Sequence, residues 1–152
     1  MTEDLSGRII KGYELRQLIG EGGFGAVYLA HQRLIGREVA VKIILPQYAN
    51  QPDFIRRFDT EAQLVARLEH PHIVPLYDYW REPGGAYLVM RYLRGGSLHQ
   101  SLKKEGPWKP ERTKEMLAQI AAGLMVAHRQ GVIHRDLKPE NILLDENGNA
   151  YL

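Results

Sequence analysis

The sequence predicts an α+β fold, in which an antiparallel five-stranded sheet with one main helix precedes a mostly helical second part. Three observations lead to this prediction. A glycine-rich segment, residues 20–25, is followed by two β-rich runs joined by a short turn, which is typical of a hairpin. Apolar residues recur at helical spacing after Pro52. A longer apolar periodicity after Pro110 predicts a second helix that ends at Gly131.

The composition is that of an ordinary globular protein. The chain has 152 residues, of which 44% are hydrophobic and 25% charged, enough for one domain or two small lobes. The 20 basic and 18 acidic side chains leave a net charge of +2. That near balance gives no sign of a general affinity for nucleic acid or membrane surfaces, so we expect neither as a partner. The sequence has no cysteine, which excludes disulfides and thiolate metal sites.

Targeting signals are not evident in the sequence. Residues 1–4 are acidic and lack an apolar core, so they do not form a secretory signal. No apolar run approaches the roughly 20 residues that a membrane-spanning helix needs. We therefore expect no membrane segment in this chain and a cytoplasmic protein.

The first half of the sequence predicts a strand at 10–18 and then a hairpin around the glycines. The hairpin comprises the runs 26–30 and 39–44, joined by a turn at 34–37. Glycines at the start of a hairpin allow the backbone to lie close over phosphate groups. A plain flexible turn is the alternative. A dinucleotide-dependent oxidoreductase is disfavoured, because its glycine loop would open a helix instead of a hairpin.

A lysine and a glutamate in this half form a candidate ion pair. Lys42 lies in a run that otherwise predicts a buried strand, where a lone cation is costly unless an anion pairs with it. After Pro52, Glu61 is the only charge on a helical stripe with four apolar residues: Phe54, Phe58, Val65 and Leu68. We therefore expect Lys42 to pair with Glu61. A salt bridge of purely structural use is the alternative.

The remaining elements follow from turn and cap signals. Strands are expected at 76–80 and 86–92, separated by a turn at 82–85. A capping box at 97–100 predicts the start of a short helix, which ends at residues 106–107. The helix after Pro110 is expected to bury one apolar side, formed by Leu117, Ile120, Ala121, Leu124 and Ala127 and widened by Met116 and Gly123.

Residues 134–141, His-Arg-Asp-Leu-Lys-Pro-Glu-Asn, concentrate polar chemistry in a loop that Pro139 keeps from continuing as a regular helix. Asp136 could accept a proton from a hydroxyl, Lys138 could meet an anion, and Asn141 could offer an oxygen to a metal. The segment matches the H-R-D-L-x-x-x-N pattern of protein kinases. Together with the glycine loop, the lysine and the helical glutamate in the same order, it makes the chain resemble a eukaryotic-like, bacterial-type serine/threonine protein kinase domain over residues 12–152.

The resemblance implies a kinase-like fold with an N-terminal tail at 1–11, a small lobe at 12–93 and part of a large lobe at 94–152. It implies that ATP and Mg²⁺ are the cofactors and that a protein serine or threonine hydroxyl is the acceptor. Asp136, Lys138, Lys42 and Glu61 would then be the catalytic residues, and Asn141 the metal ligand. The nucleotide-binding residues would be Gly20, Glu21, Gly22, Gly23, Phe24, Gly25, Val27, Ala40, Lys42, Met90, Arg91, Leu93 and Leu143.

Within the resemblance, individual residues have distinct roles. Val27, Ala40 and Leu143 would sandwich the adenine, and Met90 would line the back of its pocket. The backbones of Arg91 and Leu93 would face the adenine edge, so these residues would form the hinge. The lysine in the loop at 134–141 resembles the serine/threonine branch. Arg135 beside Asp136 resembles kinases whose activation segment is positioned by a phosphate.

The sequence also departs from the family pattern. The Asp-Phe-Gly motif that supplies a magnesium ligand does not occur in it, so we expect weak phosphoryl transfer by this chain alone. We also expect the helix after Pro110 to expose an apolar patch that favours self-association or another partner. The alternative to a kinase is a non-catalytic nucleotide-binding or interaction module built on the same fold.

Overall fold

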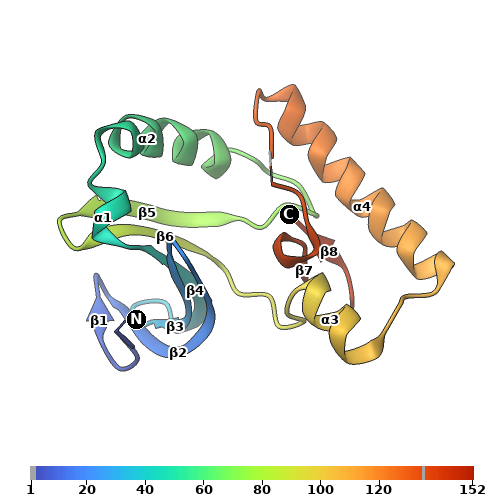
Figure 1. Ribbon diagram of the computed structural model, residues 1–152, viewed down its shortest axis with the longest axis horizontal. Coiled ribbons are helices and arrows are strands. Elements are labelled where there is room, and N and C mark those ends of the chain that lie inside the picture. The colour runs from blue at the N-terminus through green and yellow to red at the C-terminus, as the bar shows by residue number, and fades with distance from the viewer. Residues whose placement is uncertain (1–2, 135) are drawn as a thin grey trace. The chain divides into compact units, whose positions relative to one another are not determined.

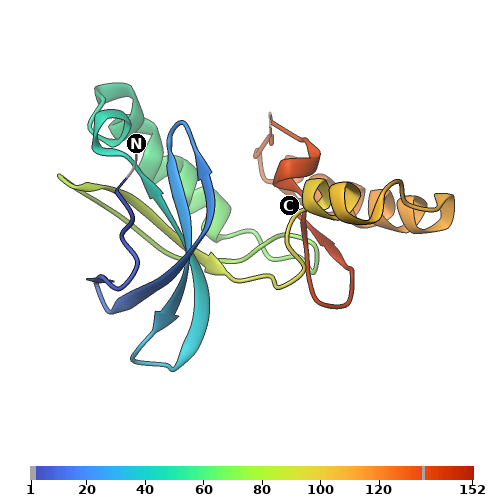
Figure 2. The ribbon, with the colours of Figure 1, turned by 60° about the horizontal axis from the view of Figure 1, so that its bottom comes forward.

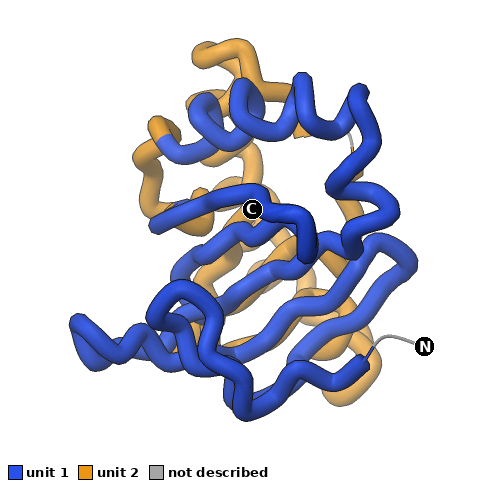
Figure 3. Tube along the Cα trace, turned by 90° about the vertical axis from the view of Figure 1, so that its left-hand side faces the viewer, with its two compact units in different colours: residues 1–66, 76–92 blue, residues 67–75, 93–152 orange. Residues whose placement is uncertain are grey.

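The computed structural model describes residues 3–134 and 136–152, which cluster into two compact units (Figure 3). Unit 1 contains the chain up to Ala66 and the segment Leu76–Tyr92. Unit 2 contains Arg67–Pro75 and Leu93–Leu152. Each unit has its own buried core, so each is described separately.

Unit 1 is built on a curled antiparallel sheet (Figure 1, Figure 2). Within the part of the chain that the structure describes, this sheet has six strands in the order β1-β2-β3-β4-β6-β5. Their bounds are β1 Ile9–Ile10, β2 Tyr13–Gly22, β3 Gly25–Gln32, β4 Arg37–Ile44, β5 Leu76–Glu82 and β6 Gly85–Arg91. The predicted antiparallel sheet is therefore confirmed, and the hairpin after the glycines is formed by β3 and β4.

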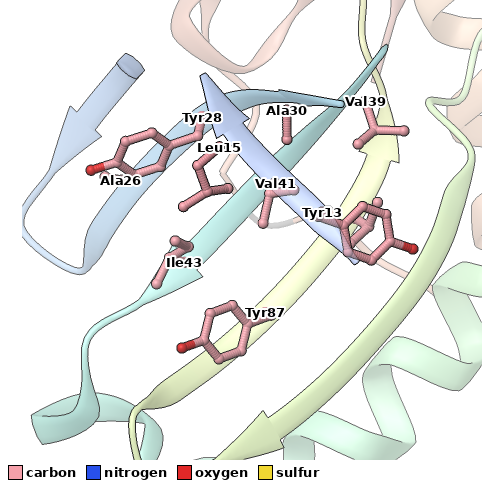
Figure 4. Close-up of a cluster of buried hydrophobic side chains, with 10 residues drawn as sticks. Tyr13, Leu15, Ala26, Tyr28, Ala30, Val39, Val41, Ile43 and Tyr87 are labelled. Carbon is pink, nitrogen blue, oxygen red and sulfur yellow. The ribbon is translucent and has the colours of Figure 1, made fainter. Parts of the chain in front are cut away.

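The main core of unit 1 lies on one face of this sheet (Figure 4). Alternate residues of neighbouring strands supply it, because side chains directly opposite each other in an antiparallel pair share a face. Ala26, Ile43 and Tyr87 form one such row across β3, β4 and β6. The next row contains Tyr28, Val41 and Val89, each 1% exposed or less. Residues between these rows point to the opposite face.

The strand β1 was not expected, because the sequence predicts five strands and assigns residues 1–11 to a tail. In the structure, Ile9 and Ile10 pair with Glu14 and Tyr13. The segment before them is fixed by a hydrogen bond from the Leu5 amide to the Tyr28 hydroxyl, at 3.0 Å. A strand of two residues is too short to show an alternating pattern, which explains why the sequence did not predict it.

Two helices cover the face of the sheet opposite the main core. They are α1, Pro46–Ala49, and α2, Pro52–Ala66. The helix predicted after Pro52 is thus confirmed, and the expected stripe is buried or partly buried at every member except Glu61. Phe58 and Ala62 are buried, whereas Glu61 is exposed. Ala62 takes the buried place expected of Glu61, because it also follows Phe58 at helical spacing. The sequence did not show this because alanine gives little apolar signal.

Unit 2 is mostly helical. Its elements are α3 Leu98–Glu105, α4 Pro110–Arg129, the 3-10 helix η1 Pro139–Asn141, and the antiparallel pair β7 Leu143–Leu144 and β8 Ala150–Tyr151. The predicted capping box at the start of α3 is confirmed, since the Gln100 amide donates to the Ser97 hydroxyl and the Gln100 side chain accepts from the Ser97 amide. The core of this unit contains Ile120 and Met116 of α4, packed against Leu98, Ile142, Leu144 and Ala150.

The buried residues of α4 all belong to the predicted apolar side, but one edge of that side is exposed. Met116, Ile120, Gly123 and Ala127 are buried. Leu117 and Ala121, expected on that side, are exposed, and Leu117 and Met125 are 57% and 54% exposed. The predicted apolar side was wide, so periodicity alone could not show which of its edges is exposed.

Among the residues described here, no helix combines the length and apolarity that crossing a bilayer requires.

Candidate functional site

The glycine-rich segment forms the tip of a hairpin in unit 1. Gly20, Glu21 and Gly22 end β2 and lie opposite Val27, Ala26 and Gly25, respectively. Gly23 and Phe24 form the two-residue turn between the strands. The backbone of this tip is therefore an extended two-stranded ribbon that ends in a turn of two residues. The glycines thus lie before the hairpin that the sequence predicted, β3 with β4, and form the tip of the preceding hairpin, β2 with β3.

The glycines of this tip differ in what their own packing requires. A Cβ on Gly25 would lie 1.8 Å from the carbonyl oxygen of Ile43, so only glycine fits there. By contrast, a Cβ on Gly22 or Gly23 would meet no atom within 4 Å. Packing inside unit 1 therefore explains Gly25 but not Gly22 and Gly23. Close approach of the backbone to a ligand would explain the latter pair.

The residues predicted to surround a nucleotide share one face of the sheet. Across β3, β4 and β6, Val27 is opposite Lys42 and Lys42 is opposite Leu88. In the neighbouring row, Leu29, Ala40 and Met90 are opposite one another. This is the face opposite the main core, so Val27, Ala40, Lys42 and Met90 form a contiguous patch with one cation beside apolar groups.

Lys42 and Glu61 both belong to unit 1 but are not paired with each other. Both side chains are exposed, and no ion pair joins them among the residues that the structure describes. The premise of a buried cation that needs a buried carboxylate is therefore wrong in this structure. Exposure removes the desolvation cost that would have forced the two charges together. Their predicted pairing during function stays a prediction.

The expected hinge residues end the sheet strand β6 and lead into unit 2. Arg91 is the last residue of β6, opposite Val39, and Leu93 is 7% exposed. In unit 2, Leu143 begins β7 and forms an antiparallel bridge with Ser97.

The loop at 134–141 brings three predicted residues of unit 2 together. The Asn141 side-chain amide donates to the Asp136 carbonyl oxygen at 2.9 Å and to its carboxylate Oδ2 at 3.1 Å. The Lys138 ammonium lies 3.5 Å from the same Oδ2. The Asp136 amide donates to His134 Nδ1 at 3.2 Å. Arg135 lies outside the described residues.

This cluster holds an exposed carboxylate in a fixed direction. The Asp136 side chain is 67% exposed, so its carboxylate is open to an incoming hydroxyl. Asn141 uses its nitrogen for both contacts with Asp136, which leaves its oxygen to meet a cation. Among the described residues, no group of three His, Cys, Asp or Glu side chains could hold a metal by itself. A divalent ion here would thus need further oxygen ligands, from water or from a bound ligand.

Main-chain hydrogen bonds fix the C-terminal end of this loop, a contact that the sequence did not predict. The backbone of residues 95–98 pairs with that of 142–144: the Gly95 amide donates to Leu144, Leu144 to Gly96, and Leu98 to Ile142, at 2.8–2.9 Å. A Cβ on Gly95 would lie 2.6 Å from the Leu144 carbonyl oxygen. The pair Gly95-Gly96 before a capping box was the sequence signal for this close approach.

A contact between two side chains supports the same end of the loop. His99, in the first turn of α3, places Nδ1 3.3 Å from Glu140 Oε1 of η1. Both side chains are about half exposed, so the pair contributes modestly to stability. It nonetheless ties η1 to a helix whose start is itself fixed by its capping box.

The buried carboxylate Asp145 has a structural role in the turn between β7 and β8. Burial raises its pKa, but hydrogen bonds from Asn149, from the Asn147 amide and from the Tyr151 hydroxyl outweigh burial and leave the pKa below its ordinary value. Both carboxylate oxygens are used by these donors, which close the turn between β7 and β8. Asp145 is therefore not a free metal ligand.

Comparison with known proteins identifies the family. Residues 13–152 match the protein kinase domain. The chain is 42% identical over 146 residues to serine/threonine-protein kinase PrkC of Bacillus subtilis (strain 168), covering 95% of this chain and 22% of that protein. It is 46% identical over 140 residues to serine/threonine-protein kinase PknD of Mycobacterium tuberculosis (strain ATCC 25618 / H37Rv), covering 92% of this chain and 21% of that protein.

A third relative extends the match to nearly the whole chain. Serine/threonine-protein kinase PknE of Mycobacterium tuberculosis (strain ATCC 25177 / H37Ra) is 39% identical over 151 residues, which is 99% of this chain and 27% of that protein. The chain spans about a fifth to a quarter of the length of these relatives. The match over residues 13–152, with the curled sheet and the loop at 134–141, shows that the chain belongs to the protein kinase domain family, in its bacterial serine/threonine type.

Proposed function

We propose that this chain binds ATP with Mg²⁺ and carries the residues that transfer the γ-phosphoryl group to a serine or threonine hydroxyl of a protein. The observation that carries the proposal is the cluster in which Asn141 and Lys138 both contact the Asp136 carboxylate. The names of the relatives, all serine/threonine-protein kinases, support the same reaction.

The reaction needs a basic group that has a fixed direction and that the acceptor hydroxyl can reach. The acceptor oxygen forms a bond to the γ-phosphorus while the bond between that phosphorus and the β–γ bridging oxygen breaks, and ADP leaves. Asp136 accepts the hydroxyl proton, and its hydrogen bond from Asn141 sets the direction of the carboxylate. Lys138, 3.5 Å from Asp136 Oδ2, offsets negative charge on the moving phosphoryl group.

Unit 1 supplies nucleotide binding. The backbone at Gly22 and Gly23 has the open space that phosphate oxygens need, and Lys42 adds a cation on the sheet face that also carries Val27, Ala40 and Met90. Adenine is expected to lie against these apolar groups. A magnesium ion, held by the Asn141 oxygen and by phosphate oxygens, would neutralise charge on the triphosphate.

The test is phosphate transfer from labelled ATP with Mg²⁺ to a basic protein and to the chain itself, on monodisperse material. The variant Asp136→Asn keeps the shape of the side chain but cannot accept the proton, so we expect a loss of transfer by a factor of about 10² or more. The matched control is Glu146→Gln, which changes an exposed carboxylate of unit 2 in the turn between β7 and β8.

The outcomes separate the proposal from its alternative. Transfer that is lost in Asp136→Asn and kept in Glu146→Gln supports the proposal. Transfer that survives in Asp136→Asn overturns the role of this residue. ATP binding that Lys42→Ala abolishes, with no transfer by the unmodified chain, supports the non-catalytic nucleotide-binding module instead.

A further inference from the structure

The turn of the glycine-rich hairpin carries an aromatic side chain that packs against a neighbouring helix. Phe24 is 67% exposed, and its ring lies edge-on to the ring of Tyr48, with centroids 4.9 Å apart and an interplanar angle of 63°. Both residues belong to unit 1. Edge-on pairs at this separation are attractive, because the positive ring edge meets the negative ring face.

Tyr48 is a fixed partner because its helix is anchored in the core. The next residue of α1, Ala49, is fully buried and packs in a cluster with Phe58 of α2 and Ala86 of β6. The amides of Tyr48 and Ala49 both donate to the Leu45 carbonyl oxygen, at 3.0 and 2.9 Å. The backbone of Tyr48 is therefore held by α1 and the core beneath it, and not by the hairpin.

The backbone next to this ring pair is also held. The Leu45 amide donates to the Phe24 carbonyl oxygen at 2.9 Å, which extends the β3–β4 pairing by one bond beyond Gly25 and Ile44. This bond joins the turn of the hairpin to the residue that precedes α1. Displacing the turn would break the Leu45 hydrogen bond and the contact between the two rings together.

We propose that Tyr48 is a positioning residue, which holds Phe24 and thereby pre-organises the turn of the glycine-rich hairpin for nucleotide phosphates. The inference rests on the proposed function, since the ligand of the hairpin is the nucleotide. A turn containing Gly23 has many backbone conformations, and a phosphate that binds it must otherwise restrict them. The Phe24–Tyr48 contact restricts them in advance, so its loss weakens binding.

The first experiment needs no nucleotide. Amide hydrogen exchange at Leu45 reports the opening of its bond to Phe24. We expect Tyr48→Ala to speed exchange at Leu45 about two- to tenfold, which is the range for an aromatic pair, and Tyr48→Phe to leave it unchanged because the ring remains. The control Tyr77→Ala removes a partly exposed ring from β5 and should not alter this amide. Unchanged exchange in Tyr48→Ala would overturn the proposal.

The second experiment measures ATP affinity for Tyr48→Ala, Phe24→Ala and the double variant. We expect each single variant to raise the Kd about two- to tenfold, and the double variant to be no weaker than the weaker single one, because both remove the same contact. Thermal unfolding and the rescue by Tyr48→Phe separate positioning from misfolding. Additive losses, or a Kd unchanged in Tyr48→Ala, would overturn the proposal. If the unmodified chain binds no ATP, the proposed function fails, and the exchange measurement still decides whether Tyr48 holds the turn.

Discussion

The side-chain amide of Asn141 donates hydrogen bonds to both the carbonyl oxygen and the carboxylate of Asp136, at 2.9 and 3.1 Å. One amide thus fixes the direction of the candidate base and spans the turn that Pro139 begins in η1. The same side chain has a second use in the proposed reaction, since its oxygen is the expected magnesium ligand. The two uses can be separated experimentally.

Replacing Asn141 by leucine should loosen the loop without unfolding unit 2. The change removes two hydrogen bonds from an exposed side chain, so we expect a cost of about 1 kcal/mol or less in unfolding free energy. Amide exchange at Lys138 and at residues 140–142 should rise, and transfer should fall by at least tenfold. Backbone exchange that stays unchanged while transfer falls would mean that the Asn141 side chain acts only as a metal ligand. Glu146→Gln is again the control.

Asp145 should make stability depend on pH. Because folding lowers its pKa, the unfolded chain binds this proton more readily, so the contribution of Asp145 is present above its ordinary pKa of about 3.9 and is lost as pH falls through the lower folded value. We expect Asp145→Asn to cost about 1–3 kcal/mol at pH 7, because donors facing both oxygens lose an acceptor.

Urea unfolding at pH 7, 4 and 3 measures this effect. The difference in unfolding free energy between the unmodified chain and Asp145→Asn should narrow on acidification. Protonation of Asp145 neutralises the same charge that the substitution eliminates. A gap that is constant or wider at pH 3 would contradict the assignment. Glu146→Gln, in the same turn but exposed, should show no such gap at any pH.

Substitution by alanine should destabilise unit 1 at one glycine of the β2–β3 hairpin and leave its stability nearly unchanged at another. Gly25→Ala places a Cβ against the Ile43 carbonyl oxygen, so we expect it to destabilise unit 1 by about 1–3 kcal/mol. Gly23→Ala enters open space at a backbone angle that alanine accepts, so stability should change by less than about 0.5 kcal/mol. ATP affinity should nonetheless fall in Gly23→Ala. Urea unfolding and ATP titration check both, and equal stability losses would contradict the distinction.

Much of the fold followed from periodicity and turn chemistry, and the errors have a common physical origin. The hairpin after the glycines, the helix after Pro52 and the capping box at Ser97 all have strong local signals. The orientation of Glu61 did not follow, because the stripe through positions 58 and 61 and the one through 58 and 62 both fit 3.6 residues per turn. Apolar residues spread widely around α4, so periodicity could not show which of them would be exposed. Contacts between distant segments, such as Phe24 with Tyr48, have no sequence period at all.

Lys42 and Glu61 should be dispensable for stability. A buried ion pair that loses one partner costs about 3–5 kcal/mol, but both side chains here are exposed and unpaired with each other. We therefore expect Lys42→Met and Glu61→Gln each to change the unfolding free energy by less than about 0.5 kcal/mol. ATP affinity should fall in Lys42→Met. A loss of several kcal/mol in either variant, measured by urea unfolding, would show that the chain forms the buried pair in solution.

The exposed apolar stripe of α4 should make the chain self-associate. Leu117, Ala121 and Met125 follow one another at intervals of four residues, so they lie on one side of the helix, away from buried Ile120. Replacing Leu117 and Met125 by lysine together should reduce association measured by sedimentation at several concentrations. Stability should not fall, since neither side chain is in the core of unit 2. The control Leu34→Lys removes an exposed leucine from unit 1. If that control abolishes association and the α4 variant does not, the contact lies on the sheet unit instead.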